Sequence, residues 1–178
     1  MNKQFIAIVI GSLCVACNSL QYSEPQAGER ARVRFATTSE SVTVLFGYGD
    51  NQCNEENELM RLRNGPLLNS SPKKLGIPLW AFNDNAAKEV YVAADRPFNA
   101  MFKGQTLTSA TYRTHTWTHC GAPFSVTFKA NHDYEVKFEE QRCVLEVNEI
   151  IANSRVPVDA TFNDNPNCRA AFEKVRAY

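Results

Sequence analysis

The chain has 178 residues, of which 44% are apolar and 21% are charged. A chain of this length and composition forms one ordinary domain with a hydrophobic core, and it matches neither a disordered nor a collagen-like composition. Its 19 lysines and arginines balance its 19 aspartates and glutamates. No overall positive charge is therefore present to attract nucleic acid, and we expect neither DNA nor RNA as a partner.

The chain begins with the layout of a secretory signal peptide. Lys3 precedes an apolar run over 5–16, which at about a dozen residues is shorter than the roughly 20 that a membrane-spanning helix needs. We assign residues 1–16 to processing rather than to the fold. The polar stretch that follows predicts a flexible tether over 17–30, and we place the single folded domain at 31–178.

Val15, Ala16 and Cys17 close the apolar run. In these residues the chain resembles the lipobox of bacterial lipoprotein precursors, and its layout is similar to that of small Gram-negative envelope lipoproteins. Cys14 stands where that motif usually has leucine. The resemblance implies that Cys17 is lipidated, palmitate included, becomes the mature N-terminus and anchors the protein in a membrane. Asn18, in place of aspartate, implies the periplasmic face of the outer membrane. An ordinary cleaved signal peptide and an uncleaved anchor are the alternatives.

Four cysteines remain after the signal region, namely Cys53, Cys120, Cys143 and Cys168. An even number in an exported chain is typical of two disulfides in an oxidising compartment. We predict the pairs Cys53–Cys120 and Cys143–Cys168, since the second would pin the C-terminal tail to the strand that begins at Cys143. No two of these four cysteines have the C-x2-C spacing, so we expect no zinc site. The oxidising compartment disfavours a catalytic thiol, and we expect no cofactor.

Short segments with alternating or continuous apolar residues predict a mainly β chain. We expect strands at 32–36, 41–48, 89–93, 97–102, 124–128, 134–138 and 143–150. The first two are expected to form one hairpin, and 124–128 and 134–138 another. Residues 54–62 fit a helix or a strand, and 167–176 fit a short C-terminal helix. About seven to eight strands with few helices predict an antiparallel β-sandwich.

A long irregular insertion covers residues 64–88, and it is rich in proline. Trp80 within it is expected to plug an edge of the sandwich or to anchor a ligand. Ser70 and Ser71 each precede a lysine at the S-x-x-K spacing of some acyl hydrolases, but no Lys-Thr-Gly follows. Phe82–Asn85 recurs at 162–165, and such Asn-Asp segments are ordinary turns more often than calcium ligands.

The segment His115-Thr-Trp-Thr-His119 is the strongest candidate for a functional surface. Two histidines four residues apart can share a metal on a helix, but the surrounding threonines favour a strand, in which the two lie about 13 Å apart. We therefore expect no metal there. On a strand, Arg113, His115, Trp117 and His119 would share one face, and we predict a binding surface formed by these residues, with Trp80 as a further candidate.

These patterns predict a lipid-anchored envelope protein, not an enzyme, with a structural or protein-binding role and a partner that the sequence does not identify. The alternative is a ligand-binding or enzyme-inhibitor module, similar to lipid-anchored lysozyme inhibitors, which would use a protruding loop. A hydrolase is the third hypothesis, and it has only the S-x-x-K spacing in its favour.

Overall fold

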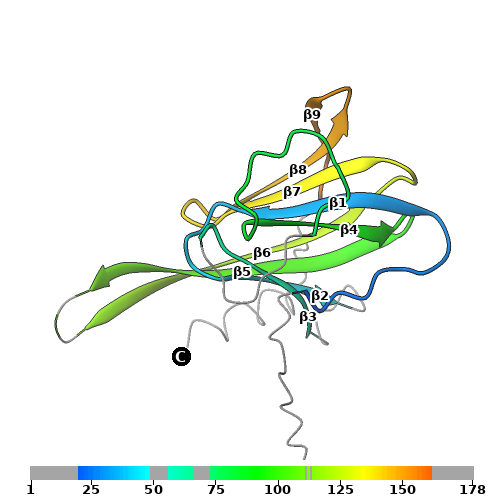
Figure 1. Cartoon of the computed structure of the whole chain (residues 1–178). Coiled ribbons are helices and arrows are strands. Elements are labelled where there is room, and N and C mark those ends of the chain that lie inside the picture. Colours follow the sequence, from blue (N-terminus) through cyan, green and yellow to red (C-terminus); the bar gives the residue numbers. More distant parts are fainter. Residues whose placement is uncertain (1–19, 49–55, 66–72, 111, 113, 162–178) are drawn as a thin grey trace, which may run out of the picture.

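The computed structural model describes residues 20–48, 56–65, 73–110, 112 and 114–161 (Figure 1). Within these ranges, nine strands form two sheets and there is no helix. The prediction of a mainly β, sandwich-like fold is confirmed. The proposed C-terminal helix at 167–176 lies outside the described residues, whereas the ambiguous segment 54–62 contributes a strand.

The five-stranded sheet has the order β4-β1-β7-β8-β9, and the four-stranded sheet has the order β3-β2-β5-β6. Within the sheets, β1 and β7 run parallel and the other neighbouring pairs are antiparallel. The strands are β1 (Arg30–Thr37), β2 (Thr43–Tyr48), β3 (Glu56–Leu62), β4 (Ala87–Ala93), β5 (Pro97–Ala110), β6 (His115–Thr127), β7 (Asp133–Glu139), β8 (Val144–Ile151) and β9 (Ser154–Pro157).

Aromatic rings from both sheets form the centre of the core. Phe102 of β5 stacks on Phe138 of β7 with ring centroids 5.2 Å apart, and on Phe124 of β6 at 6.0 Å. Phe35 of β1 lies 5.5 Å from Phe98. Such ring pairs stabilise a core beyond the area that they bury. The alternation of large apolar and polar residues in the sequence therefore identified the faces that meet between the sheets.

The predicted hairpin between the first two strands is wrong, because β1 and β2 lie in different sheets. β1 is a central strand whose two edges are taken by β4 and β7, so it has no edge left for β2. Hydrogen bonds within the segment that connects β1 to β2 also hold its two ends together. The Thr37 and Thr43 hydroxyls lie 3.1 Å apart, and the backbone N–H of Ser39 donates to Thr37 Oγ1. These hydroxyls direct the chain across the edge of the sandwich.

The second predicted hairpin is also wrong. The segments 124–128 and 134–138 do face one another, but across the core, since β6 and β7 belong to different sheets. The rings of Phe128 and Tyr134 pack at a tilt, with centroids 4.9 Å apart. Asn131 between them has a left-handed backbone, with φ of 61°, and its N–H donates to the carbonyl of Arg30. A period of two shows which residues face the core, but not which strand lies alongside.

The segment before β1, which we predicted as part of a tether, lies against the sandwich from Leu20 onwards. Leu20 forms a β-bridge with Met60 of β3. Glu24 accepts a hydrogen bond from the backbone N–H of Tyr91 and forms an ion pair with Lys73 at 2.7 Å. The described chain is therefore in contact with the domain already at Leu20, its first residue and ten positions before β1.

The outer face of the five-stranded sheet holds a buried network of charges. The guanidinium of Arg34 in β1 is completely buried and forms ion pairs with Glu89 of β4 at 2.8 Å and Glu135 of β7 at 2.9 Å. Arg155 of β9 pairs with the same Glu135 at 2.7 Å. Alternating charges thus come from four of the five strands of this sheet, namely β4, β1, β7 and β9, and β8 lies between the last two.

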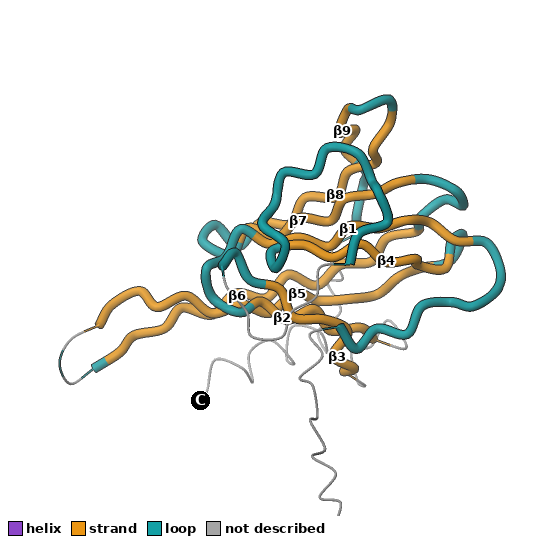
Figure 2. The backbone as a smooth tube through the Cα atoms, in the orientation of Figure 1, coloured by secondary structure: helices purple, strands orange, loops and turns teal. Residues whose placement is uncertain are grey.

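A loop over residues 73–86 covers this network (Figure 2). Arg34 donates to the backbone carbonyls of Ile77 and Pro78, while the second carboxylate oxygen of Glu89 accepts from the backbone N–H groups of Leu75 and Gly76. Because a buried charge is tolerated only when it is fully paired, the network both requires the loop and holds it in place.

Candidate functional site

A two-stranded ribbon extends from the body of the sandwich (Figures 1 and 2). It is the far part of the β5–β6 hairpin, residues 104–120, which we call the arm. β2 pairs with β5 only as far as Val44 opposite Lys103, so beyond that point β5 has β6 as its only neighbour among the described strands. Both outer edges of the arm therefore lack a neighbouring described strand.

The arm leaves the body at a tightly packed base. Cys120 of β6 is bonded to Cys143, which follows the last residues of β7, with Cα atoms 5.6 Å apart. Opposite Cys120 lies Gly104, where an added Cβ would stand 2.8 Å from the buried carboxylate of Glu140. The Ser39 hydroxyl donates to that carboxylate. The base thus fixes the arm to the other sheet, and this attachment sets its direction.

The disulfide corrects our predicted pairing. Cys120 and Cys143 are bonded to each other, and this bond excludes both predicted pairs, Cys53–Cys120 and Cys143–Cys168. Cys143 lies in the turn before β8, and this turn folds against the base of the arm, where Cys120 is. No pattern in the sequence indicates that contact, so the predicted pairing was wrong. Cys53 and Cys168 lie outside the described residues.

The arm carries most of the residues that we predicted as a binding surface. The backbone is extended from His115 to His119, and in register Trp117 is opposite Leu107 while His119 is opposite Gln105. His119 is half-buried. The side chains of His115 and Trp117 lie outside the structural description, as does Arg113 altogether.

Two exposed apolar side chains on the arm were not among the predicted site residues. Leu107, opposite Trp117, is 42% exposed, and Tyr112 in the connecting turn is fully exposed. Leu107 was missed because the strand segment expected from the sequence ended at 102, eight residues before the end of β5. The threonines of 104–110 have high β propensity, but apolar and polar residues do not alternate there. In the structure a bulge between Leu107 and Ser109 interrupts the strand pairing.

The extended backbone gives the two histidines the spacing of a strand, so His115 and His119 are too far apart to share one ion, at about 13 Å. Among the described residues, no group of three or more His, Cys, Asp or Glu side chains is placed to hold a metal.

Trp80 lies in the 73–86 loop, far along the chain from the arm. Its ring stacks under two cations, with the Arg34 guanidinium carbon 5.1 Å and Lys74 Nζ 4.2 Å from the ring centroid. The indole N–H donates to the carbonyl of Phe82 at 2.7 Å. These contacts give Trp80 a structural role, but over the buried charges of the five-stranded sheet and not as the predicted plug at an edge of the sandwich.

Cys17, the predicted anchor residue, lies outside the described residues. In the part of the chain that is described, no helix is long and apolar enough to cross a membrane.

No family model matches this sequence, no curated protein is significantly similar to it, and no solved structure is significantly similar to its fold.

Proposed function

We propose that this protein is a lipid-anchored envelope protein, held at the periplasmic face of the outer membrane through Cys17, that binds a protein partner with its arm. The single observation that carries the binding role is a ribbon that extends beyond both sheets and exposes Leu107 and Tyr112. The anchor is supported by the lipobox-like residues Val15 to Cys17 alone.

The composition of the arm favours pairing with another protein over simple exposure to solvent. Between Gly104 and Cys120 the sequence has no acidic residue and no lysine, and its cationic side chains are Arg113 and two histidines. Exposed strand edges are normally protected by charges, especially lysine, because an unprotected edge pairs with other strands. An arm without that protection suits a partner that covers its edge or its aromatic face.

Strand alternation predicts that His115, Trp117 and His119 share one face of the arm. Tryptophan, tyrosine and arginine are the residue types that contribute most to protein–protein binding energy. Trp117, Tyr112 and Arg113 place all three types at or near the tip. An enzyme inhibitor would use a protruding element of the same kind, so the identity of the captured partner separates an envelope complex from an inhibited enzyme.

The test is site-specific photo-crosslinking in cells that express the full chain. A photoreactive phenylalanine analogue replaces Tyr112 in one variant and Ile151, an exposed apolar residue of β8, in the control. We expect one crosslinked protein from position 112 and none of that mass from position 151. Equal crosslinking from both positions, or none from either, contradicts the proposal.

A second pair of variants tests the energetics. Trp117→Ala should lose the crosslinked partner while its thermal midpoint stays close to that of the wild type, whereas Ile151→Ala should retain the partner. If Trp117→Ala instead unfolds the domain, Tyr112→Ser, whose side chain is fully exposed, takes its place. A folded Tyr112→Ser or Trp117→Ala variant that retains the partner in full refutes binding through the arm.

A further inference from the structure

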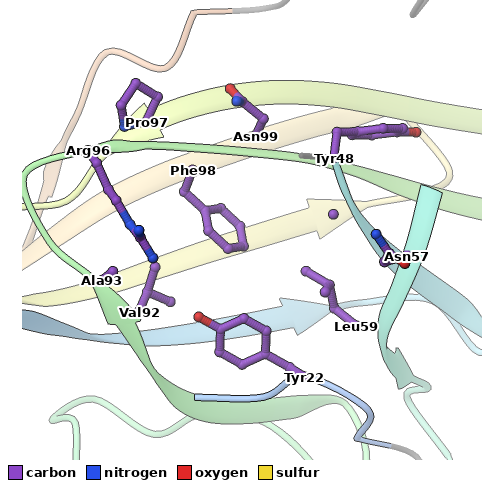
Figure 3. A pocket seen from close by; sticks show the side chains of 11 residues that line it. Tyr22, Tyr48, Asn57, Leu59, Val92, Ala93, Arg96, Pro97, Phe98 and Asn99 are labelled. Atoms are coloured by element: carbon purple, nitrogen blue, oxygen red, sulfur yellow. The ribbon is translucent and has the colours of Figure 1, made fainter. Parts of the chain in front are cut away.

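A cleft of about 740 Å³ opens at the opposite end of β5 from the arm (Figure 3). It lies between β4 and β3, the strands that end the two sheets on this side. Its volume falls within the range of ligand sites in proteins, about 300–1,000 Å³. No property of the arm depends on this cleft, so any role that it has is separate from the proposed function.

The floor of the cleft is apolar and continuous with the core. Phe98 of β5 is only partly buried there, and it packs against Phe35 at 5.5 Å and Phe128 at 5.9 Å. Leu59 of β3 and Val92 of β4 form the two walls. A ligand that enters would therefore place an apolar group directly on the aromatic cluster.

The mouth of the cleft is cationic. Arg96, in the turn between β4 and β5, is exposed, and its guanidinium makes no hydrogen bond or ion pair with another described residue. The Arg96 side chain and the Tyr22 hydroxyl point toward one another across the cleft in Figure 3. Burial, and next the Glu24 carboxylate, raise the pKa of Tyr22, while Arg96 acts in the opposite direction. Tyr22 therefore keeps its proton at neutral pH and can donate a hydrogen bond.

From this geometry we propose that the cleft binds an anionic amphiphile, whose carboxylate or phosphate head lies on Arg96 and Tyr22 and whose single apolar chain lies on Phe98. One guanidinium and one hydroxyl can satisfy one such head, and a guanidinium binds carboxylate and phosphate equally well in geometry. A polyphosphate would need further cations, and the described residues that line the cleft include no second one.

The N-terminal segment places this cleft close to the predicted anchor, a point that rests on the proposed function. Tyr22 is itself part of the cleft, and its backbone N–H donates to the carbonyl of Leu59 at 2.8 Å. Cys17 lies three positions before Leu20, the first described residue, so at most about 11 Å of chain joins their Cα atoms. A lipidated Cys17 would therefore hold the cleft near the bilayer surface, where free fatty acids and lysophospholipids occur.

The test measures binding of decanoate and of decyl phosphate by isothermal titration calorimetry. The chain from residue 17 with Cys17→Ser is used, since it keeps every described residue and carries no acyl chain of its own. We expect saturable binding with one site. Arg96→Gln should weaken it about tenfold, the typical effect of losing a charge-assisted hydrogen bond. Arg142→Gln, which removes an exposed arginine at the far end of β7, should leave it unchanged.

Decanol, with the same chain and no charge, is the ligand control and should bind more weakly than either anion. Tighter binding of decanoate identifies a fatty acid as the natural ligand class, and tighter binding of decyl phosphate identifies a phospholipid. The proposal is overturned if neither anion saturates the protein, or if Arg96→Gln binds them as the wild type does. Because the protein used is not lipidated, this outcome is independent of whether Cys17 is an anchor and of what the arm binds.

Discussion

Arg34 shows how one residue can determine whether a whole face of the protein is ordered. It is the fully buried cation between Glu89 and Glu135, and it also holds the carbonyls of the covering loop. Removing one partner of a buried ion pair leaves uncompensated charge in the interior, which is far more costly than never having had the pair.

We therefore predict that Arg34→Met lowers the free energy of unfolding by about 3–5 kcal/mol, measured by urea denaturation. The exposed pair Arg142–Glu139 supplies the control, and Arg142→Gln should unfold at the wild-type midpoint. Adding Glu89→Gln and Glu135→Gln to Arg34→Met should restore part of the loss, because the uncompensated charges are then removed. No recovery in that triple variant would show that packing of the loop, rather than charge, dominates.

Tyr134 gives the protein a predictable response to alkaline pH. Burial raises its pKa above the ordinary value, although a hydrogen bond from the backbone N–H of Lys129 opposes this. The folded state therefore holds the phenol proton to higher pH than the unfolded state does. The contribution to stability is complete below about pH 10 and is lost as pH rises through the folded-state pKa.

Comparing the wild type with Tyr134→Phe tests this sign. At pH 7 the variant should be less stable by about 1 kcal/mol, since the Lys129 N–H loses its acceptor. Above pH 10, the stability of the wild type should fall more steeply than that of the variant, so that the two curves of unfolding free energy against pH converge. Parallel curves would assign the alkaline loss to other groups.

At the scale of elements, the arm depends on its base. Gly104 has a conformation open to any residue, but a Cβ at this position would stand 2.8 Å from the side chain of Glu140, which is 4% exposed and cannot move aside into solvent. We predict that Gly104→Ala lowers stability by about 1–3 kcal/mol, the usual cost of overpacking. Gln105→Ala, at the next and exposed position, should have little effect on the thermal midpoint. Equal effects would contradict the close packing of the base.

Most of the strands could be predicted from the sequence, because Phe124, Val136 and their neighbours alternate with polar residues at a period of two. Their pairing could not. The same alternation fits a hairpin and a pair that faces across the core, and only long-range contacts such as Phe128 on Tyr134 decide between them. The arm's position in the sequence was predicted from its histidines and tryptophan, but its protrusion follows from how far β2 extends along β5. The cleft left no signal, since its residues come from five separate segments.

At the scale of the whole molecule, the predicted anchor would determine where the protein acts. Replacing Cys17 by serine should block lipidation, because the thiol is the only group of that residue that can carry the diacylglyceryl chain. We expect the Cys17→Ser chain to lose labelling by radioactive palmitate and to remain unprocessed or soluble on fractionation. Cys14→Ser should behave as the wild type. Palmitate labelling that persists in Cys17→Ser would refute the lipoprotein assignment.

The position of β1 between β4 and β7 governs when the protein can fold. Arg32 and its partner Asp133 are 101 residues apart, so the five-stranded sheet has no complete centre until β7 has been made. Contacts so distant make folding slow. A chain that ends after β6 should show no cooperative unfolding transition, since β1 would lack one of its two neighbours. Such late closure would keep the chain unfolded until β7 has been made, which suits the export in an unfolded form that the signal-peptide-like N-terminus predicts.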